Sequence, residues 1–342
     1  MKNINKQRRQ QFLYTELYEA AKEYLREVRE SVRGYVNSGM PLDLGAVAEY
    51  ANDFWCALDA LQLEYTAGSP IEEVKAMYPA VVDAFEKWCQ AKREWQFNEF
   101  PEDRGQVEPT PVELEDIGGY QQMMRLFSLG VLLNEGELLR RAHTALGIWR
   151  GRDTVIEALV EDYIDEPCDE AEGLFHFELY DDLIGAAWAE TPDESVKRMQ
   201  TFLKRWYKAY RGQPWHDAHL RVGDVPEKPN WANYYGYWAF EAGALAYLYE
   251  LDDTAYCEHL IYPKDLVDWA RSQGRPHKPE LPPQQQEVLT ARPGEPCPEA
   301  GEWYAVNWDG RKAVLEKGDP MPGPEYSKTG VVIWHRKRES KR

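Results

Sequence analysis

Residues 231–251 constrain the fold more than any other stretch of this sequence. Between residues 234 and 251 only two side chains are charged, while seven are aromatic. Apolar and small side chains fall on every side of a helical wheel, which is typical of a helix inside a protein or a bilayer. A bilayer span requires about 20 mostly apolar residues without a central charge, whereas Glu241 lies mid-segment. We therefore expect a buried central helix of a soluble protein, with Gly236 and Gly243 letting neighbouring helices approach closely.

Glu241 is the most unusual residue of that stretch, because a buried carboxylate without a partner is very costly. One interpretation makes it an acid of an enzyme site that includes His216 and His219. The H-x-x-H spacing does not place two ligands on one helical face, and both histidines lie in a loop that contains Pro and Gly. Ion-pair networks also bury carboxylates. We therefore favour a structural role, in which an Arg, Lys or Tyr pairs with Glu241 and residues 202–207 supply the cation.

Apolar residues recur at helical spacing through most of the first 273 residues. Short connections between such helices make antiparallel neighbours. The pattern predicts a mainly α fold, an antiparallel helical bundle or array around the aromatic-rich central helix. We divide it into an N-terminal helical region (1–112) and a C-terminal helical region (113–273) of one continuous domain. The expected helices are 5–36, 43–65, 71–98, 113–133, 137–149, 153–164, 175–190, 193–210, 255–260 and 261–272.

The end of the chain has a different character. Residues 274–293 are rich in Pro and Gln without any period, which predicts a linker. Residues 294–342 contain short runs of aromatic and β-branched residues, and Asp309-Gly310 between two runs is a hairpin signal. We expect a small β module of three or four strands, followed by a basic tail.

Acidic residues dominate the composition. The 59 Asp and Glu residues outnumber the 40 Lys and Arg residues, which gives a formal charge of -19. Residues 153–194 hold 15 carboxylates and no Lys or Arg. The negative electric field of such a protein repels nucleic acid and anionic lipid and attracts basic partners. The alternative is that the acidic residues only keep the protein soluble. The acidic run lacks the ligand spacing and glycine of a calcium loop, so we expect no metal.

Several kinds of chemistry find no support in the sequence. There is no phosphate-binding glycine loop, no G-x-S-x-G and no Cys-His pair of recognisable context. The five cysteines are scattered and form no C-x-x-C, which favours a reducing compartment over disulfides or structural zinc. The N-terminus lacks the apolar core of a signal peptide. We expect a cytoplasmic protein that uses no cofactor and is not an enzyme.

Three segments resemble a known family. FLKRWYKAYRGQPWHDAH (202–219), NYYGYWAFEAGALAYLYELDD (233–253) and IYPKDLVDW (261–269) resemble the C-terminal signature of PoNi-type immunity proteins, and residues 5–200 resemble their N-terminal region more loosely. These proteins are the cognate inhibitors of PoNe-type polymorphic DNase toxins that competing bacteria exchange. The resemblance implies a mostly helical, non-catalytic protein that binds one nuclease toxin tightly in the cytoplasm. It implies no direct contact with nucleic acid or membrane, and it allows a homodimer.

Two sets of residues follow from this interpretation. The shared signature is apolar and predicts scaffold residues, namely Trp206, Tyr207, Trp215, His219, Tyr234, Tyr235, Trp238, Glu241 and Asp265. A nuclease carries cationic surface for phosphates, so carboxylates of the acidic segment are the candidates for toxin binding. These are Glu161, Asp162, Asp165, Glu166, Asp169, Glu170, Glu172, Asp181 and Asp182.

Two other function classes remain open at this stage. One is an acidic adaptor or DNA mimic that binds many basic proteins. The other is the enzyme that uses Glu241 with the two loop histidines. The runs GEPCPEAGEW (294–303) and KGDPMP (317–322) are similar to small modules of other toxin-locus proteins, so the β module is either a second contact or an appendage.

Overall fold

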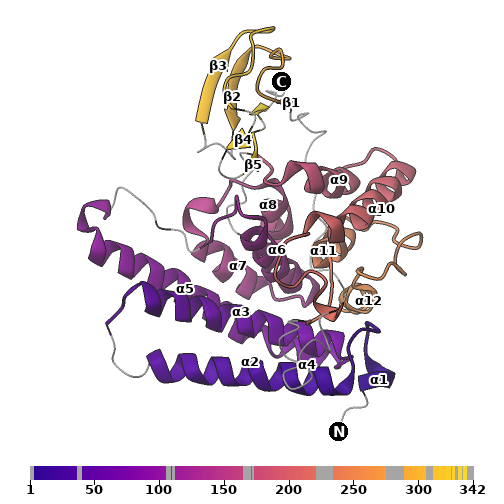
Figure 1. The fold of residues 1–342 in the computed structure, drawn as a ribbon. Helices are drawn as coiled ribbons and strands as arrows, with labels where there is room; N and C mark the ends of the chain where they lie inside the picture. Colours follow the sequence, from indigo (N-terminus) through magenta and orange to yellow (C-terminus); the bar gives the residue numbers. More distant parts are fainter. Residues whose placement is uncertain are drawn as a thin grey trace.

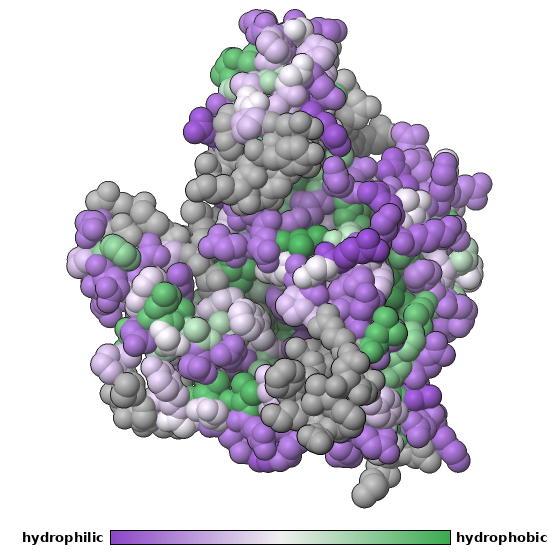
Figure 2. Space-filling model, in the orientation of Figure 1, coloured by the Kyte–Doolittle hydropathy of each residue, from purple (hydrophilic) through white to green (hydrophobic). Residues whose placement is uncertain are grey.

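The chain folds into an array of helices with a small β module at one end (Figure 1). The computed structural model describes residues 4–36, 41–104, 109, 112–164, 171, 173–220, 234–274, 289–305, 311–324, 326–327, 330–332 and 334–336. Within these ranges, every helix is too short or too polar to cross a membrane. The face in Figure 2 is mostly hydrophilic and shows only small, separate hydrophobic areas.

The N-terminal region is built on three long helices that lie side by side (Figure 1). Asp43 accepts a hydrogen bond from the Ala46 amide and so begins the second of them as its N-cap. Two expected helices are divided: residues 8–14 interrupt the first, and residues 76–77 interrupt the third. The helices are α1 (Ile4–Gln7), α2 (Thr15–Val36), α3 (Leu44–Thr66), α4 (Ile71–Lys75) and α5 (Tyr78–Glu99).

The C-terminal region surrounds one buried helix, α6 (Ile117–Leu132), which packs against helices from both halves of the chain. Residues 255–260 form turns where a short helix was expected. The other helices are α7 (Gly136–Ala145), α8 (Thr154–Val160), α9 (Phe177–Ala187), α10 (Pro192–Ala209), α11 (Phe240–Leu248) and α12 (Lys264–Ser272). Single 3-10 turns are η1 (Pro101–Asp103), η2 (Gly147–Trp149), η3 (Glu161–Tyr163) and η4 (Ala218–Leu220).

The stretch around Glu241 is buried as expected, but the prediction of one continuous helix is wrong. Residues 234–239 are extended, and only the nine residues of α11 are helical. Gly236 has a φ of 111°, a left-handed value that L side chains rarely adopt. A Cβ there would also lie 2.2 Å from the Thr66 hydroxyl oxygen. The backbone therefore cannot be helical at this glycine. Residues 231–233 of the stretch lie outside the described residues.

Side chains from the N-terminal region satisfy the extended half of this stretch. A buried backbone without helical hydrogen bonds needs other partners for its amides and carbonyls. The Gln10 amide nitrogen donates to the Tyr237 carbonyl at 2.6 Å, and its amide oxygen accepts from the Tyr237 backbone nitrogen at 2.8 Å. The Gln62 amide nitrogen donates to the Gly236 carbonyl at 2.7 Å. These bonds connect residues more than 170 positions apart in sequence.

The helical half of the stretch packs as the sequence predicted at Gly243. A Cβ at this position would lie 2.7 Å from Pro263 and 2.8 Å from Val267, at the start of α12. The missing side chain therefore lets α11 and α12 approach closely, and that packing offsets the low helix propensity of glycine.

The β module has a core of its own. Its four-stranded antiparallel sheet has the order β1-β6-β2-β3, and β4 pairs with β5. Trp303 opposite Ala313 confirms the predicted β2–β3 hairpin, whose turn lies outside the described residues, as do residues 337–342 of the basic tail. Strand β1 falls inside the expected linker 274–293. The strands are β1 (Leu289–Ala291), β2 (Gly301–Ala305), β3 (Arg311–Leu315), β4 (Tyr326–Ser327), β5 (Gly330–Val331) and β6 (Trp334–Arg336).

Candidate functional site

The acidic segment, residues 153–194, begins with a carboxylate that faces the core. Asp153 is fully buried and caps α8, since it accepts hydrogen bonds from the amides of Val155 and Ile156 at 3.0 and 2.9 Å. Its second oxygen accepts from the Phe175 amide at 3.0 Å and from the Tyr120 hydroxyl at 3.2 Å. Burial raises the pKa of Asp153 to about 7. This carboxyl group stabilises the fold and presents nothing to a partner.

Glu157 is the second acidic side chain of the segment that lies inside the protein. One of its carboxylate oxygens lies 3.0 Å from the His143 ring nitrogen and accepts from the Gly151 amide at 2.8 Å. Both side chains are buried. The first turns of α8 therefore use acidic residues for internal hydrogen bonds.

The carboxylates proposed for toxin binding begin at the end of α8. Glu161 and Asp162 open the turn η3 and are half-buried. The Tyr249 hydroxyl donates to Glu161 at 3.3 Å, which joins this turn to the end of α11. The next five candidates lie outside the described residues: Asp165, Glu166, Asp169, Glu170 and Glu172.

The last two candidates, Asp181 and Asp182, lie on α9 beside cations from α10. Arg205 lies 2.8 Å from Asp182, and Arg198 lies 3.7 Å from Asp181. Burial raises the pKa of Asp181, and Arg198 opposes that shift. Packing thus gives the segment cations that its own sequence lacks. Arg198 and Arg205 are seven residues apart and therefore lie on one face of α10. This spacing is the sequence signal that could have predicted the two ion pairs.

Glu241 lies in a hydrogen-bond network instead of an ion pair. It is 1% exposed, and one oxygen accepts from the Trp206 indole at 2.6 Å and from the Tyr180 hydroxyl at 3.1 Å. The Tyr210 hydroxyl lies 2.6 Å from that of Tyr180. The expected partner helix is correct, but it contributes an indole, while Arg205 bonds to Asp182. Burial raises the pKa of Glu241 to about 7.

The two loop histidines do not join Glu241. The His216 ring nitrogen lies 3.1 Å from the Tyr207 carbonyl oxygen, and the two rings stack at 4.2 Å. His219 lies 2.8 Å from the Tyr237 hydroxyl. None of these contacts brings either histidine to the glutamate. Among the described residues, no group of three His, Cys, Asp or Glu side chains could hold a metal ion.

The other signature residues connect distant parts of the chain. The Trp215 indole donates to Gln121 on α6 at 2.8 Å, and the Trp206 and Trp215 rings lie 5.6 Å apart. Asp265 accepts from Arg9 at 2.9 Å, which ties α12 to the segment between α1 and α2. Four further aromatic residues are half-buried or buried: Tyr207, Tyr234, Tyr235 and Trp238.

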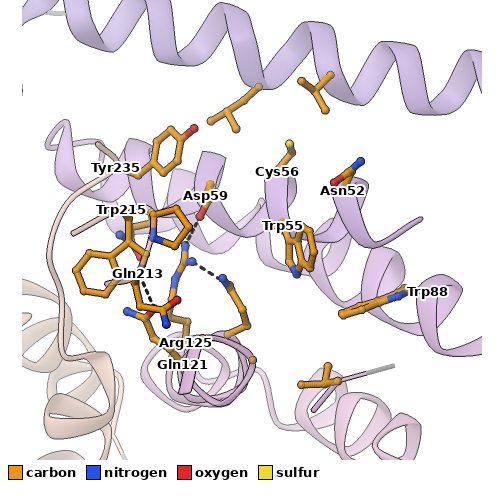
Figure 3. Close-up of a pocket in the computed structure, with 18 of the residues that line it drawn as sticks. Asn52, Trp55, Cys56, Asp59, Trp88, Gln121, Arg125, Gln213, Trp215 and Tyr235 are labelled. Atoms are coloured by element: carbon orange, nitrogen blue, oxygen red, sulfur yellow. Dashed lines mark hydrogen bonds and ion pairs between the residues drawn. The ribbon is translucent and has the colours of Figure 1, made fainter. Parts of the chain in front are cut away.

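Sequence reasoning missed a cleft between the two helical regions, which we call the acidic cleft. Its volume is about 900 Å³. Side chains of α2 and α3 form one wall, and the start of α6 with residues 213–215 forms the other (Figure 3). The extended residues 235–238 close one end. No local motif marks the cleft, because its lining residues come from six separate segments.

Comparisons with known proteins agree along most of the chain. Residues 47–143 match the model of the N-terminal part of PoNe immunity proteins (PoNi), and residues 151–266 match the model of their C-terminal part. The crystal structure of protein PA2201 from Pseudomonas aeruginosa superposes with a TM-score of 0.59 at 18% identity. That alignment covers 78% of this chain and 92% of the other, and it shows a shared fold. No curated protein matches the chain.

Proposed function

Because the chain belongs to the family of PoNe immunity proteins, we propose that it binds one cognate PoNe nuclease toxin in the cytoplasm and neutralises it without catalysing a reaction. The observation that carries the proposal is the match of both family models over residues 47–143 and 151–266. The buried network around Glu241 and the separate histidine contacts favour a scaffold over an active site.

Charge supports a basic partner. Residues 274–342 contain 12 Lys and Arg against 10 Asp and Glu, so the negative charge of the protein lies in the helical domain. A nuclease presents cationic surface to the phosphates of DNA. An anionic inhibitor complements that surface and gains association rate. We propose that the toxin approaches the helical domain, with its DNA path or active site blocked.

Within that domain, we propose the run from Glu161 to Glu172 as the main electrostatic contact. Asp153 and Glu157 are buried and bonded internally, so they contribute little to the outer field. Asp182 shares its charge with Arg205 at 2.8 Å. The seven carboxylates from Glu161 to Glu172 are the densest acidic group of the segment, which supports their choice as the contact.

Charge reversal tests this contact. The fourfold variant E161K/D162K/D165K/E166K should slow association with the toxin about tenfold or more at low salt and weaken neutralisation, because steering depends on complementary charge. Stopped-flow association rates and survival of toxin-expressing cells measure the two effects, and circular dichroism checks that helical content stays intact.

A matched control carries the same change in net charge elsewhere. Glu16, Glu19, Glu23 and Glu27 are all exposed on α2, and their reversal to Lys should slow association less. Unchanged inhibition by the acidic-segment variant at physiological salt would exclude that segment as the interface. Failure of the wild-type protein to rescue cells from a PoNe nuclease encoded next to its gene would reject the immunity function itself. Recovery of many basic proteins from cells without the toxin would favour a general adaptor.

A further inference from the structure

The acidic cleft combines four features that together specify an occupant. The first is its size. A volume of about 900 Å³ lies within the range of pockets that enclose a drug-sized ligand, and a few residues of a peptide have that size. The cleft opens between α2–α3 and α6, at the junction of the two helical regions (Figure 3).

The second feature is a wall of partly exposed aromatic rings. Trp55 and Tyr24 are 41% and 39% exposed, although both line the cleft. The Trp88 ring lies 5.8 Å from that of Trp55 and extends the wall. Exposed aromatic faces attract cations, and the planar guanidinium group of arginine stacks on them best.

The third feature is an excess of carboxylates. Arg125 and Asp59 lie in the cleft and pair with each other at 2.7 Å, so their charges largely cancel. Glu49, Glu113 and Asp116 also line it, and none of them forms an ion pair with a described residue. The cleft therefore favours a cation and repels phosphates.

The fourth feature is a pair of buried polar atoms without partners. Gln62 is 7% exposed, and its amide oxygen has no hydrogen-bond partner among the described residues, while its amide nitrogen donates to the Gly236 carbonyl. Arg125 is 6% exposed, and its Nε has none either. A buried polar group without a hydrogen-bond partner is costly for the folded protein. One is an acceptor and the other a donor. Both atoms are buried, so a peptide backbone can pair with them only after the two side chains turn toward the cleft.

We propose that the acidic cleft receives an arginine-bearing segment of the toxin polypeptide. The guanidinium group stacks on Trp55 and Tyr24 while the three carboxylates that form no ion pair with a described residue attract its charge. The backbone of the same segment supplies an N–H to Gln62 and a carbonyl to Arg125 once these two side chains turn toward the cleft. This inference rests on the proposed function and assigns the toxin a second contact, separate from the acidic segment.

Truncation of the exposed aromatic wall tests the proposal. The double variant W55A/Y24A should weaken binding of the full-length protein to a catalytically inactive form of the neighbouring nuclease by about 30-fold or more, mostly through faster dissociation. Surface plasmon resonance measures both rates. The thermal unfolding midpoint shows whether the variant stays folded. The matched control L44A/F100A removes two apolar residues that are 57% and 46% exposed and do not line the cleft, and it should bind like the wild type.

A crosslinking experiment identifies the occupant. Replacement of Trp55 by p-benzoylphenylalanine should crosslink a nuclease segment that contains arginine, as peptide mass spectrometry would show. Wild-type affinity of W55A/Y24A would overturn the cleft contact and leave the immunity function standing. A crosslinked segment without arginine would overturn the proposed chemistry. Absence of any complex with the wild-type protein would reject the immunity function and this inference together.

Discussion

The central segment (residues 234–248) and the acidic segment (residues 153–194) differ in where their polar groups find partners. The central segment has almost no charge, and the carbonyls of its extended half accept hydrogen bonds from Gln10 and Gln62, far away in sequence. The acidic segment is crowded with charge and places part of it at the surface, where arginines of α10 approach it. The first segment is specified by long-range contacts and the second by its own composition.

The comparison shows that the acidic residues of one sequence can have two different roles. Asp153, Glu157 and Glu241 are buried, and each of them accepts hydrogen bonds inside the protein. Their role is to connect helices. Glu161 and Asp162 are only half-buried, and we propose that they contribute to the electric field that a partner meets. A count of carboxylates overestimates the binding surface until the buried ones are separated from it.

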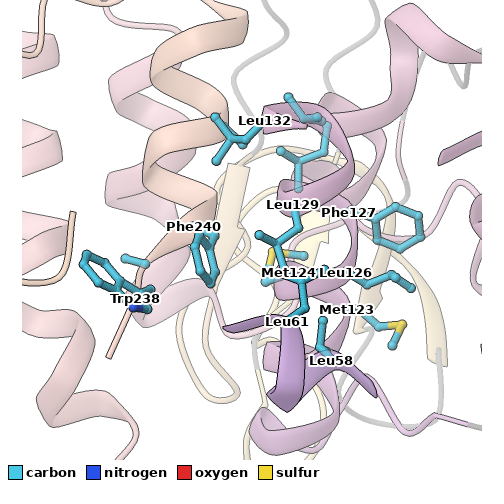
Figure 4. Close-up of a cluster of buried hydrophobic side chains, with 14 of the residues drawn as sticks. Leu58, Leu61, Met123, Met124, Leu126, Phe127, Leu129, Leu132, Trp238 and Phe240 are labelled. Carbon is cyan, nitrogen blue, oxygen red and sulfur yellow. The ribbon is translucent and has the colours of Figure 1, made fainter. Parts of the chain in front are cut away.

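The largest expected effect lies in the central segment. Trp238 belongs to the buried core cluster that also contains apolar side chains of α3 and α6 (Figure 4). Its indole donates to the Thr66 hydroxyl at 2.9 Å, and its ring lies 4.9 Å from that of Tyr65. Trp238→Ala should lower the free energy of unfolding by about 3 to 5 kcal/mol, because it leaves a cavity. Urea denaturation measures this change. The exposed Trp55→Ala should cost much less, and an equal loss would erase the contrast between core and surface tryptophans.

Glu241 should give the next largest effect, and it should depend on pH. Burial raises the pKa of Glu241 from 4.5 to about 7 in the folded state. The folded protein therefore binds an extra proton in this range. This extra proton stabilises the folded protein. The stabilisation is fully present below pH 4.5 and is lost as the pH rises through about 7. Glu241→Gln keeps an acceptor for the Trp206 indole and never ionises. Its stability relative to wild type should rise between pH 5 and pH 8, by on the order of 3 kcal/mol at most.

Chemical denaturation at several pH values measures this relative stability. Asp153 has a similarly raised pKa but is present in both proteins, so its contribution cancels in the difference. Glu241→Ala is the control, because it leaves the Trp206 and Tyr180 donors without an acceptor and should destabilise at every pH. A relative stability of Glu241→Gln that does not change with pH would show that Glu241 is ionised in the folded state.

Much of the helical fold follows from the sequence, because amphipathic periodicity and caps are local signals. Asp43 and Asp153 begin their helices as N-caps. The break before α11 could not be predicted in the same way. A run that is apolar on all sides looks alike whether it is helical or extended. The positive φ of Gly236 and the distant Gln10 decide between the two, and neither is a local pattern.

The candidate site also has one part that the sequence predicts and another that only the structure shows. A segment without cations is visible in the sequence, and it predicts a basic partner. The neutralisation of Asp182 is not visible, because Arg205 comes from the next helix. The acidic cleft cannot be predicted from any local pattern, because Trp55 and Arg125 line the same cavity only when α3 packs beside α6. Local composition thus predicts the kind of partner, and tertiary packing determines where it binds.

The smallest expected effect concerns the ion pair that neutralises Asp182. Arg205 and Asp182 form an ion pair whose side chains are 49% and 20% exposed. Such surface pairs contribute about 0 to 1 kcal/mol, so Arg205→Ala should change the free energy of unfolding by less than about 1 kcal/mol. It should also raise the rate of toxin association at low salt, because Asp182 regains its full field. Arg26→Ala removes one cation from α2, where Glu23 and Glu30 flank it, and gives the matched control. Equal rate increases from both variants would mean that net charge alone steers the toxin, whereas a larger increase from Arg205→Ala would place the encounter at α9.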